Sequence, residues 1–231
     1  LIGLDIGTSG AKCILVDDKG AVLASSTQEY PLSTPKPGWA EQNPQDWWDA
    51  VVRGLKAILP KANVPKDQIA GVSFSGQMHG LVALDKDLNV IRPAILWNDS
   101  RTQPQTDQLN QNPGKATLGR LTGNIAFAGF TAPKLLWMKE QEPNLFARMA
   151  KILLPKDYIN YRLTGVLSTD YSDASGTLLL DVEHGCWSQE MLDLCGLRED
   201  QLPPLHKSFE PIGTVKPDLA RRLGLPRGVT V

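Results

Sequence analysis

The sequence predicts a mixed α/β fold in which strands come first and helices follow. The N-terminal segment has the pattern of an antiparallel meander, because glycine-containing turns separate short apolar runs. These runs are residues 1–6, 13–16 and 21–27. The first two lack a clean alternation of apolar and polar residues, which is typical of strands covered on both faces.

A long amphipathic helix is expected after the meander. Asn43 offers a side-chain cap, Pro44 stands at the first helical position, and Pro60 ends an apolar stripe at helical spacing. Further strands are predicted at 69–75, 81–84 and 94–97. The pattern then becomes mainly helical, with Thr131 and Ser188 as the expected caps of two helices.

Composition excludes several classes of function. Lys and Arg total 24 against 25 Asp and Glu, a net charge of -1, which argues against a nucleic acid or an anionic membrane as partner. The three cysteines and three histidines lack the spacing of metal ligands or of a disulfide framework. No apolar stretch reaches the roughly 20 residues that span a bilayer, and no signal peptide is recognisable, so a cytoplasmic location is expected.

The first candidate site is the glycine turn at residues 7–10, which follows Asp5 and precedes Lys12. Backbone N–H groups of such a turn can hold a phosphate, and glycine permits the close approach that this needs. Lys12 would add a positive charge, and Asp5 would hold a magnesium ion through its water molecules. A plain hairpin turn with Asp5 as a local acceptor explains the same pattern, and spacing does not separate the two.

Two further segments carry polar residues next to predicted strands. Ser-Gly-Gln-Met-His-Gly at 75–80 could direct side chains into a cleft, or could be a turn with one structural histidine. Leu-Trp-Asn-Asp-Ser-Arg at 96–101 combines an indole with an amide, a carboxylate and a guanidinium, which suits a polyhydroxylated ligand. A tryptophan at an edge together with a helix cap at Asp99 is the alternative.

Six segments taken in order resemble one family. DIGTSGAK, SGQMHG, AILWNDSR, GFTAPKLLWMKEQ, LLPKDYI and SDASGT are similar to the N-terminal domain of the FGGY carbohydrate kinases, and within them to the members that phosphorylate xylulose. The resemblance covers essentially the whole chain. It implies an actin-like, ribonuclease-H-like α/β domain with a mixed sheet and flanking helices. It also implies transfer of the γ-phosphoryl group of ATP, with Mg²⁺, to the 5-hydroxyl of D-xylulose.

The resemblance assigns roles to residues of the glycine turn. Asp5 matches the aspartate that organises the magnesium ion near the transferred phosphoryl group. The residues that match the first phosphate loop are Gly7, Thr8 and Ser9, and Lys12 stands where many relatives have arginine. Lysine keeps the charge of that contact but loses the planar, two-point grip on phosphate.

The resemblance places the sugar on the other two segments. The substrate-binding residues it implies are Gln77, Met78, His79, Trp97, Asn98 and Asp99. Lys134 and Trp137 belong to a family segment for which a structural role is expected. Residues 1–231 are expected to form the N-terminal sugar-binding domain, and the C-terminal nucleotide-binding domain, with the general base, is expected to lie outside this chain.

Other functions stay open at this point. A kinase for ribulose, gluconate or glycerol would share most of these segments. An ATP-dependent binding protein of the actin or chaperone type would share the hairpin around Asp5 but would not explain the sugar segments. The expected partners are ATP and a small sugar, and the resemblance leaves room for a homodimer of the full-length protein.

Overall fold

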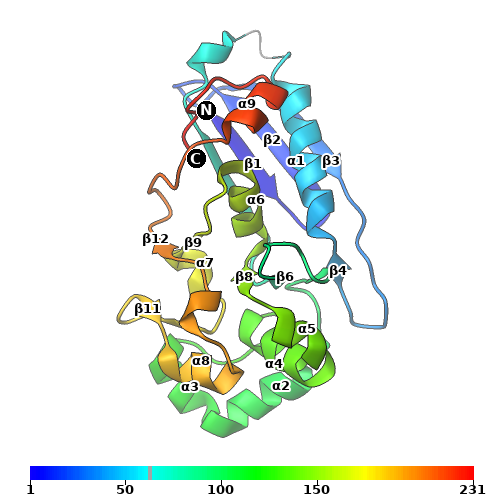
Figure 1. Cartoon of the computed structure of the whole chain (residues 1–231), viewed down its shortest axis with the longest axis vertical. Coiled ribbons are helices and arrows are strands. Elements are labelled where there is room, and N and C mark those ends of the chain that lie inside the picture. The colour runs from blue at the N-terminus through cyan, green and yellow to red at the C-terminus, as the bar shows by residue number, and fades with distance from the viewer. Residues whose placement is uncertain (62–63) are drawn as a thin grey trace.

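The computed structural model describes residues 1–61 and 64–231 and contains one principal sheet. Its strands lie in the order β3-β2-β1-β5 (Figure 1). Their bounds are Ile2–Ile6 for β1, Gly10–Val16 for β2, Val22–Glu29 for β3 and Val72–Gly76 for β5. The first three strands are antiparallel neighbours, as the meander prediction required, and β5 joins β1 in parallel.

One face of this sheet is buried and the other is largely open. Ile2, Leu4 and Ile6 of β1 are buried, whereas Asp5 between them is exposed. The prediction that both faces are covered was therefore wrong for β1, because its side chains alternate between the helix side and the open side. Lys12 and Ser75 lie next to Asp5 on the neighbouring strands and are exposed with it.

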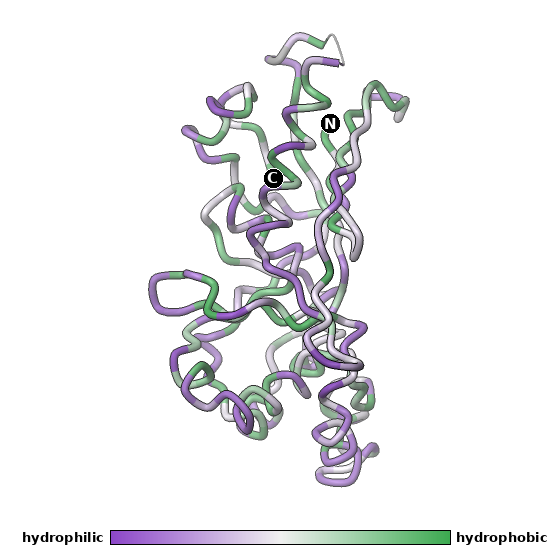
Figure 2. The backbone as a smooth tube through the Cα atoms, turned by 90° about the vertical axis from the view of Figure 1, so that its right-hand side faces the viewer, coloured by the Kyte–Doolittle hydropathy of each residue, from purple (hydrophilic) through white to green (hydrophobic). Residues whose placement is uncertain are grey.

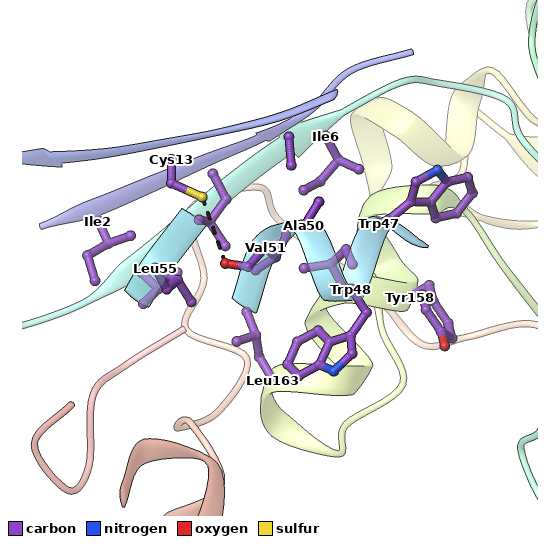
Figure 3. Packing of buried hydrophobic residues seen from close by; sticks show 14 of the residues in the cluster. Ile2, Ile6, Cys13, Trp47, Trp48, Ala50, Val51, Leu55, Tyr158 and Leu163 are labelled. Carbon is purple, nitrogen blue, oxygen red and sulfur yellow. Dashed lines mark hydrogen bonds between the residues drawn. The ribbon is translucent and has the colours of Figure 1, made fainter. Parts of the chain in front are cut away.

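Helix α1 (Pro44–Ile58) covers the buried face, and its start follows the sequence signals. The side chain of Asn43 accepts a hydrogen bond from the backbone N–H of Gln45, and Pro44 opens the helix. Figure 3 shows Val51 and Leu55 of α1 packed against the sheet, with the Cys13 thiol donating to the Val51 carbonyl. Burial raises the pKa of the Cys13 thiol to about 12, so it is an inert core group.

Two more helices complete this sheet core. They are α6 (Pro155–Thr164) and α9 (Pro217–Leu223), which contribute residues such as Tyr158 and Leu219 to the same cluster. Thr230, after α9, forms a parallel bridge with Gly71 just before β5. Both termini consequently lie at the sheet end of the molecule (Figure 1).

The other end of the molecule is mainly helical, as predicted (Figure 1). Its principal helices are α2 (Gln103–Leu109), α3 (Lys115–Thr122), α4 (Thr131–Gln141), α5 (Pro143–Arg148) and α8 (Gln189–Cys195). They enclose a second, helical core that includes Leu118, Leu135 and Met191. In the side view of Figure 2, hydrophobic and hydrophilic residues alternate along these helices.

Short elements connect the sheet core and the helical core. The small strands pair as β4 (Glu41–Gln42) with β7 (Ala94–Ile95), β6 (Val82–Leu84) with β8 (Lys151–Leu153), β9 (Thr169–Asp170) with β12 (Leu205–His206), and β10 (Leu180–Asp181) with β11 (Cys186–Trp187). A short helix, α7 (Tyr171–Ser175), follows β9 directly. The remaining short helices are the 3-10 helices η1 (Lys66–Gln68) and η3 (Glu199–Gln201) and the π-helix η2 (Asn110–Gly114).

The two predicted helix caps have different outcomes. Ser188 caps α8 by accepting a hydrogen bond from the backbone N–H of Met191 at 3.4 Å, as expected. Thr131 is not a cap, because it is the first residue of α4 and Phe130 occupies the cap position. The Thr131 hydroxyl instead donates to the carbonyl of His79, so a tertiary contact replaces the local one. In the described ranges no helix is long and apolar enough to cross a membrane.

A buried ion network joins the two cores. Arg101 pairs with Glu41 at 2.7 Å and with Asp99 at 2.7 Å, and Arg92 bridges Glu41 to Glu142. The Arg101 guanidinium also stacks over the Trp39 ring at 3.6 Å. Buried charges of this kind are tolerated only when each is paired, so the network fixes how the segments before β4 and α2 meet.

We expect Arg101→Met to lower the free energy of unfolding by about 3 kcal/mol, because it leaves the buried Asp99 carboxylate without a cationic partner while Glu41 keeps only Arg92. Urea unfolding of the 231-residue chain measures this. The matched control is Arg198→Met, which removes an exposed pair with Asp200 and should change stability by less than about 1 kcal/mol. Equal losses in the two variants would contradict a structural role for the network.

Candidate active site

Asp5 lies on the open face of the sheet. Its register partners are Lys12 on β2 and Ser75 on β5, and the Ser75 hydroxyl donates to the Asp5 carboxylate at 3.3 Å. One long hydrogen bond leaves most of the acceptor capacity of this carboxylate free. Asp5 is therefore exposed, with free acceptor positions, and its role toward a metal ion stays a prediction.

Two carbonyl groups of the glycine turn after Asp5 accept hydrogen bonds from side chains of other segments. The Tyr30 hydroxyl donates to the Gly7 carbonyl, and the Gln42 amide donates to the Thr8 carbonyl at 2.7 Å. No hydrogen-bond partner for the backbone N–H groups of Thr8 and Ser9 is found within the described ranges. A turn with occupied carbonyls and free N–H groups is suited to an anion, and this geometry favours the phosphate-holding interpretation over a plain hairpin.

Gly10 ends the turn because two strands approach closely there. A Cβ atom at this position would lie 2.8 Å from the Gln28 carbonyl oxygen on β3. Burial, together with the nearby charge of Asp5, raises the pKa of the Tyr30 phenol above its ordinary value. Tyr30 therefore stays protonated at neutral pH and keeps donating to the turn.

Gln42 connects the glycine turn to the second candidate segment. Besides the Thr8 carbonyl, its amide nitrogen reaches the Pro31 carbonyl at 3.3 Å. Its amide oxygen accepts from the Trp47 indole and from the Gln77 amide, each at 2.9 Å. A single buried side chain therefore ties the turn, helix α1 and the segment after β5 to one another.

The segment after β5 presents two of its three predicted residues to a cavity. Gln77 is buried, because its side chain turns inward to Gln42 and its backbone N–H donates to the Ile6 carbonyl at 2.8 Å. Met78 is 51% exposed, and together with His79 it lines a cavity of about 850 Å³. Phe130, Lys156 and other residues from the segments around α4, α6 and α7 also line this cavity.

The backbone of His79 is held in a conformation that a histidine rarely adopts. Its φ angle is 62°, in the left-handed region, and its carbonyl accepts from Lys134 Nζ at 2.9 Å and from the Thr131 hydroxyl at 3.1 Å. Lys134 also donates to the Gly129 carbonyl. The ammonium group thus links the loop that contains His79 to the loop that contains Gly129. This contact is a structural one, as expected for Lys134.

The imidazole of His79 is neutral at physiological pH. Burial, followed by the positive charge of Lys134, lowers its pKa to about 4. The ring packs against Phe130 with 4.6 Å between centroids, and its buried Nδ1 has no hydrogen-bond partner in the part of the chain that the structure describes. A neutral imidazole has one nitrogen that donates and one that accepts, so it can form a hydrogen bond with a hydroxyl group.

The third segment divides between the site and the interior. Trp97 is 45% exposed, and its indole N–H donates to the Thr8 hydroxyl at 3.0 Å, which places it beside the glycine turn. Asn98 is exposed as well. Asp99 is 2% exposed, and its carboxylate is occupied by Arg101 and by the backbone N–H of Ala40.

The structure therefore gives Asp99 a place in the ion network and not in the site wall. A contact between Asp99 and a ligand, which the sequence suggested, would require buried ion pairs to open. Within the described ranges no group of three or more metal-ligating side chains is present. A lone, accessible carboxylate such as Asp5 still suits Mg²⁺, which usually keeps several water molecules and binds through one or two carboxylates plus substrate phosphates.

Sequence reasoning missed several residues that shape this region. Tyr30 and Gln42 lie outside the quoted segments, and Phe130 lies in GFTAPKLLWMKEQ without a role of its own; all three act through contacts with residues distant in the chain. Gly176 belongs to the SDASGT segment, which was noted only as part of the resemblance. Its position against the ring of His79 is visible only in three dimensions.

Comparison with known proteins identifies the family. The model of the FGGY family of carbohydrate kinases, N-terminal domain, matches residues 1–231. The chain is 46% identical to a xylulose kinase of Bacillus subtilis (strain 168) over 225 residues, which are 97% of this chain and 45% of that protein. This chain therefore belongs to the FGGY family of carbohydrate kinases.

Solved structures agree with this assignment. A protein of Brucella ovis described as a xyloylose kinase superposes with a TM-score of 0.93 and 42% identity, covering 100% of this chain and 47% of that one. A gluconate kinase of Lactobacillus acidophilus gives the same TM-score at 32% identity, covering 99% and 46%. The predicted actin-like α/β fold is confirmed, and the chain spans about half the length of the relatives it matches.

We expect Gln42→Leu to lower the free energy of unfolding by about 2 kcal/mol or more, because it leaves buried donors and a carbonyl unpaired. The indole N–H signals of Trp47 and Trp97 should shift in NMR spectra, the first directly and the second through Thr8. Gln45→Leu makes the same change on the exposed surface of α1 and serves as the control. A loss no greater than that of the control would contradict the connecting role of Gln42.

Proposed function

We propose that this chain supplies the sugar pocket and the first phosphate loop of an ATP-dependent kinase that converts D-xylulose to D-xylulose 5-phosphate. One observation carries the proposal. Gln42 hydrogen-bonds both to the glycine turn, whose backbone N–H groups are free, and to the segment that bears Met78 and His79. A phosphate site and a sugar site are thereby held at the same end of β1 and β5. The names of the similar xylulose kinases support the choice of sugar.

Each group has a defined task in this proposal. The N–H groups of Thr8 and Ser9, with the charge of Lys12, stabilise the terminal phosphates of ATP, and Trp97 covers one side of the same turn. Met78 and the neutral imidazole of His79 orient the sugar by apolar contact and by a hydrogen bond to a hydroxyl group. Catalysis then rests on alignment and on neutralising charge, as in phosphoryl transfer generally.

A magnesium ion fits the donors present on this face. Asp5 would hold it through water molecules, because one exposed carboxylate cannot fill six coordination positions. When bound, such an ion supplies positive charge at the phosphate oxygens. Asp5 itself is on the same end of the sheet as the glycine turn, which keeps the carboxylate close to where that charge is needed.

We further propose that a second, nucleotide-binding domain completes the site and carries the general base. This follows from the share of the relatives that the chain spans, 45% of the Bacillus subtilis protein. The 231-residue chain alone is expected to release no ADP in a coupled assay with ATP, Mg²⁺ and D-xylulose. Turnover at ordinary kinase rates by this chain alone would contradict the division of the site.

We expect Asp5→Asn to reduce kcat about 100-fold in the two-domain kinase while the KM for D-xylulose changes little, since it removes charge near the phosphates and no sugar contact. Steady-state assays with D-xylulose, ribulose, gluconate and glycerol measure both constants and rank the sugars. Asp18→Asn, in the exposed turn between β2 and β3, makes the same chemical change and is the control. A large rise in KM with normal kcat would contradict the role given to Asp5.

A further inference from the structure

Gly176 follows α7 in a conformation that does not require glycine. Its φ and ψ angles are -80° and 0°, an ordinary right-handed conformation open to any residue. A Cβ atom there would nevertheless lie 2.3 Å from Cε1 and 2.5 Å from Nδ1 of His79. The side chain is therefore excluded at position 176 by the imidazole ring and not by the backbone.

The ring cannot move away from Gly176 without disturbing other contacts. Its backbone is fixed by Lys134 and Thr131, which both donate to the His79 carbonyl. The ring also packs against Phe130, with 4.6 Å between centroids. The imidazole is thus in close contact with both Phe130 and Gly176, while its backbone is held separately by Lys134 and Thr131.

The position of Gly176 is itself fixed by charge. Lys156 pairs with Asp157 at 2.6 Å, with Asp170 at 2.8 Å and with Asp173 at 3.3 Å. Asp170 precedes α7 and Asp173 lies within it, and the backbone N–H of Gly176 donates to the Asp173 carbonyl at 3.2 Å. The mostly buried Lys156 side chain therefore anchors α7, and with it Gly176, to the start of α6.

We propose that Gly176 is a positioning residue for His79 and that residues 176 and 79 form a size-matched pair that places the imidazole for sugar binding. The proposal rests on the function proposed above, in which His79 orients the sugar. A methyl group at 176 would displace the imidazole from its present place in the lining of the cavity. The displaced ring would no longer hold its nitrogen atoms where the proposed hydrogen bond to a sugar hydroxyl needs them.

The test is a double-mutant cycle with Gly176→Ala and His79→Ala in the two-domain kinase. Gly176→Ala should raise the KM for D-xylulose about ten-fold with kcat nearly unchanged, and in the His79→Ala background it should add almost nothing. Gly119→Ala is the matched control, because the space around Gly119 is open, and its KM should equal that of the wild type. An unchanged KM in Gly176→Ala, or an additive cycle, would overturn the role of this pair in sugar binding.

A second measurement separates this inference from the proposed function. In the 231-residue chain, Gly176→Ala should shift the imidazole NMR signals of His79 and lower the melting temperature, and His79→Ala should remove most of that loss. These readouts need no sugar and no turnover. Unmoved signals would overturn the positioning role even if the kinase activity is confirmed. Moved signals in a protein that does not phosphorylate xylulose would leave the positioning role standing and refute the proposed function.

Discussion

The buried amide of Gln42 is the contact on which the arrangement of the site depends. An amide has two donors and an acceptor with two lone pairs, and here the donors face the carbonyls of Thr8 and Pro31 while the oxygen faces Trp47 and Gln77. Buried polar networks are rigid when every member is satisfied. Gln42 therefore holds the glycine turn and the Met78–His79 segment at a constant separation, which a reaction between two bound substrates requires.

Lys134 plays a similar part on the helical side. It is fully buried, and burial lowers its pKa to about 7, so keeping the ammonium charged in this place is costly. Its bonds to the carbonyls of His79 and Gly129 offset that cost and fix the left-handed conformation of His79. The strained histidine is thus maintained by a helix whose own residues do not line the cavity, and the helical core supports the site indirectly.

The sequence was informative where structure is local and uninformative where it depends on distant contacts. The meander, the start of α1 and the Ser188 cap follow from turn chemistry, proline and side-chain caps, and all are present. Trp97 and Asp99 stand two residues apart in one segment, yet the first reaches Thr8 and the second enters the ion network. Thr131 has the right residue type for a cap but bonds to His79 instead, because α4 begins beside that loop. Such choices depend on partners that the linear pattern does not reveal.

Asp5 on β1 and Lys12 on β2 are neighbours of opposite charge, and both remain accessible to a ligand. The two residues are register partners on the open face, but within the described ranges no ion pair joins them. An exposed ion pair is worth about 1 kcal/mol or less, so the fold gains little by forming one. Opposite charges that are adjacent but unpaired can each bind a separate partner. The carboxylate can bind a hydrated cation, and the ammonium group can bind a phosphate oxygen. In the proposed kinase both partners would belong to one complex of Mg²⁺ and ATP, so the spacing of the two strands would set the spacing of the two contacts.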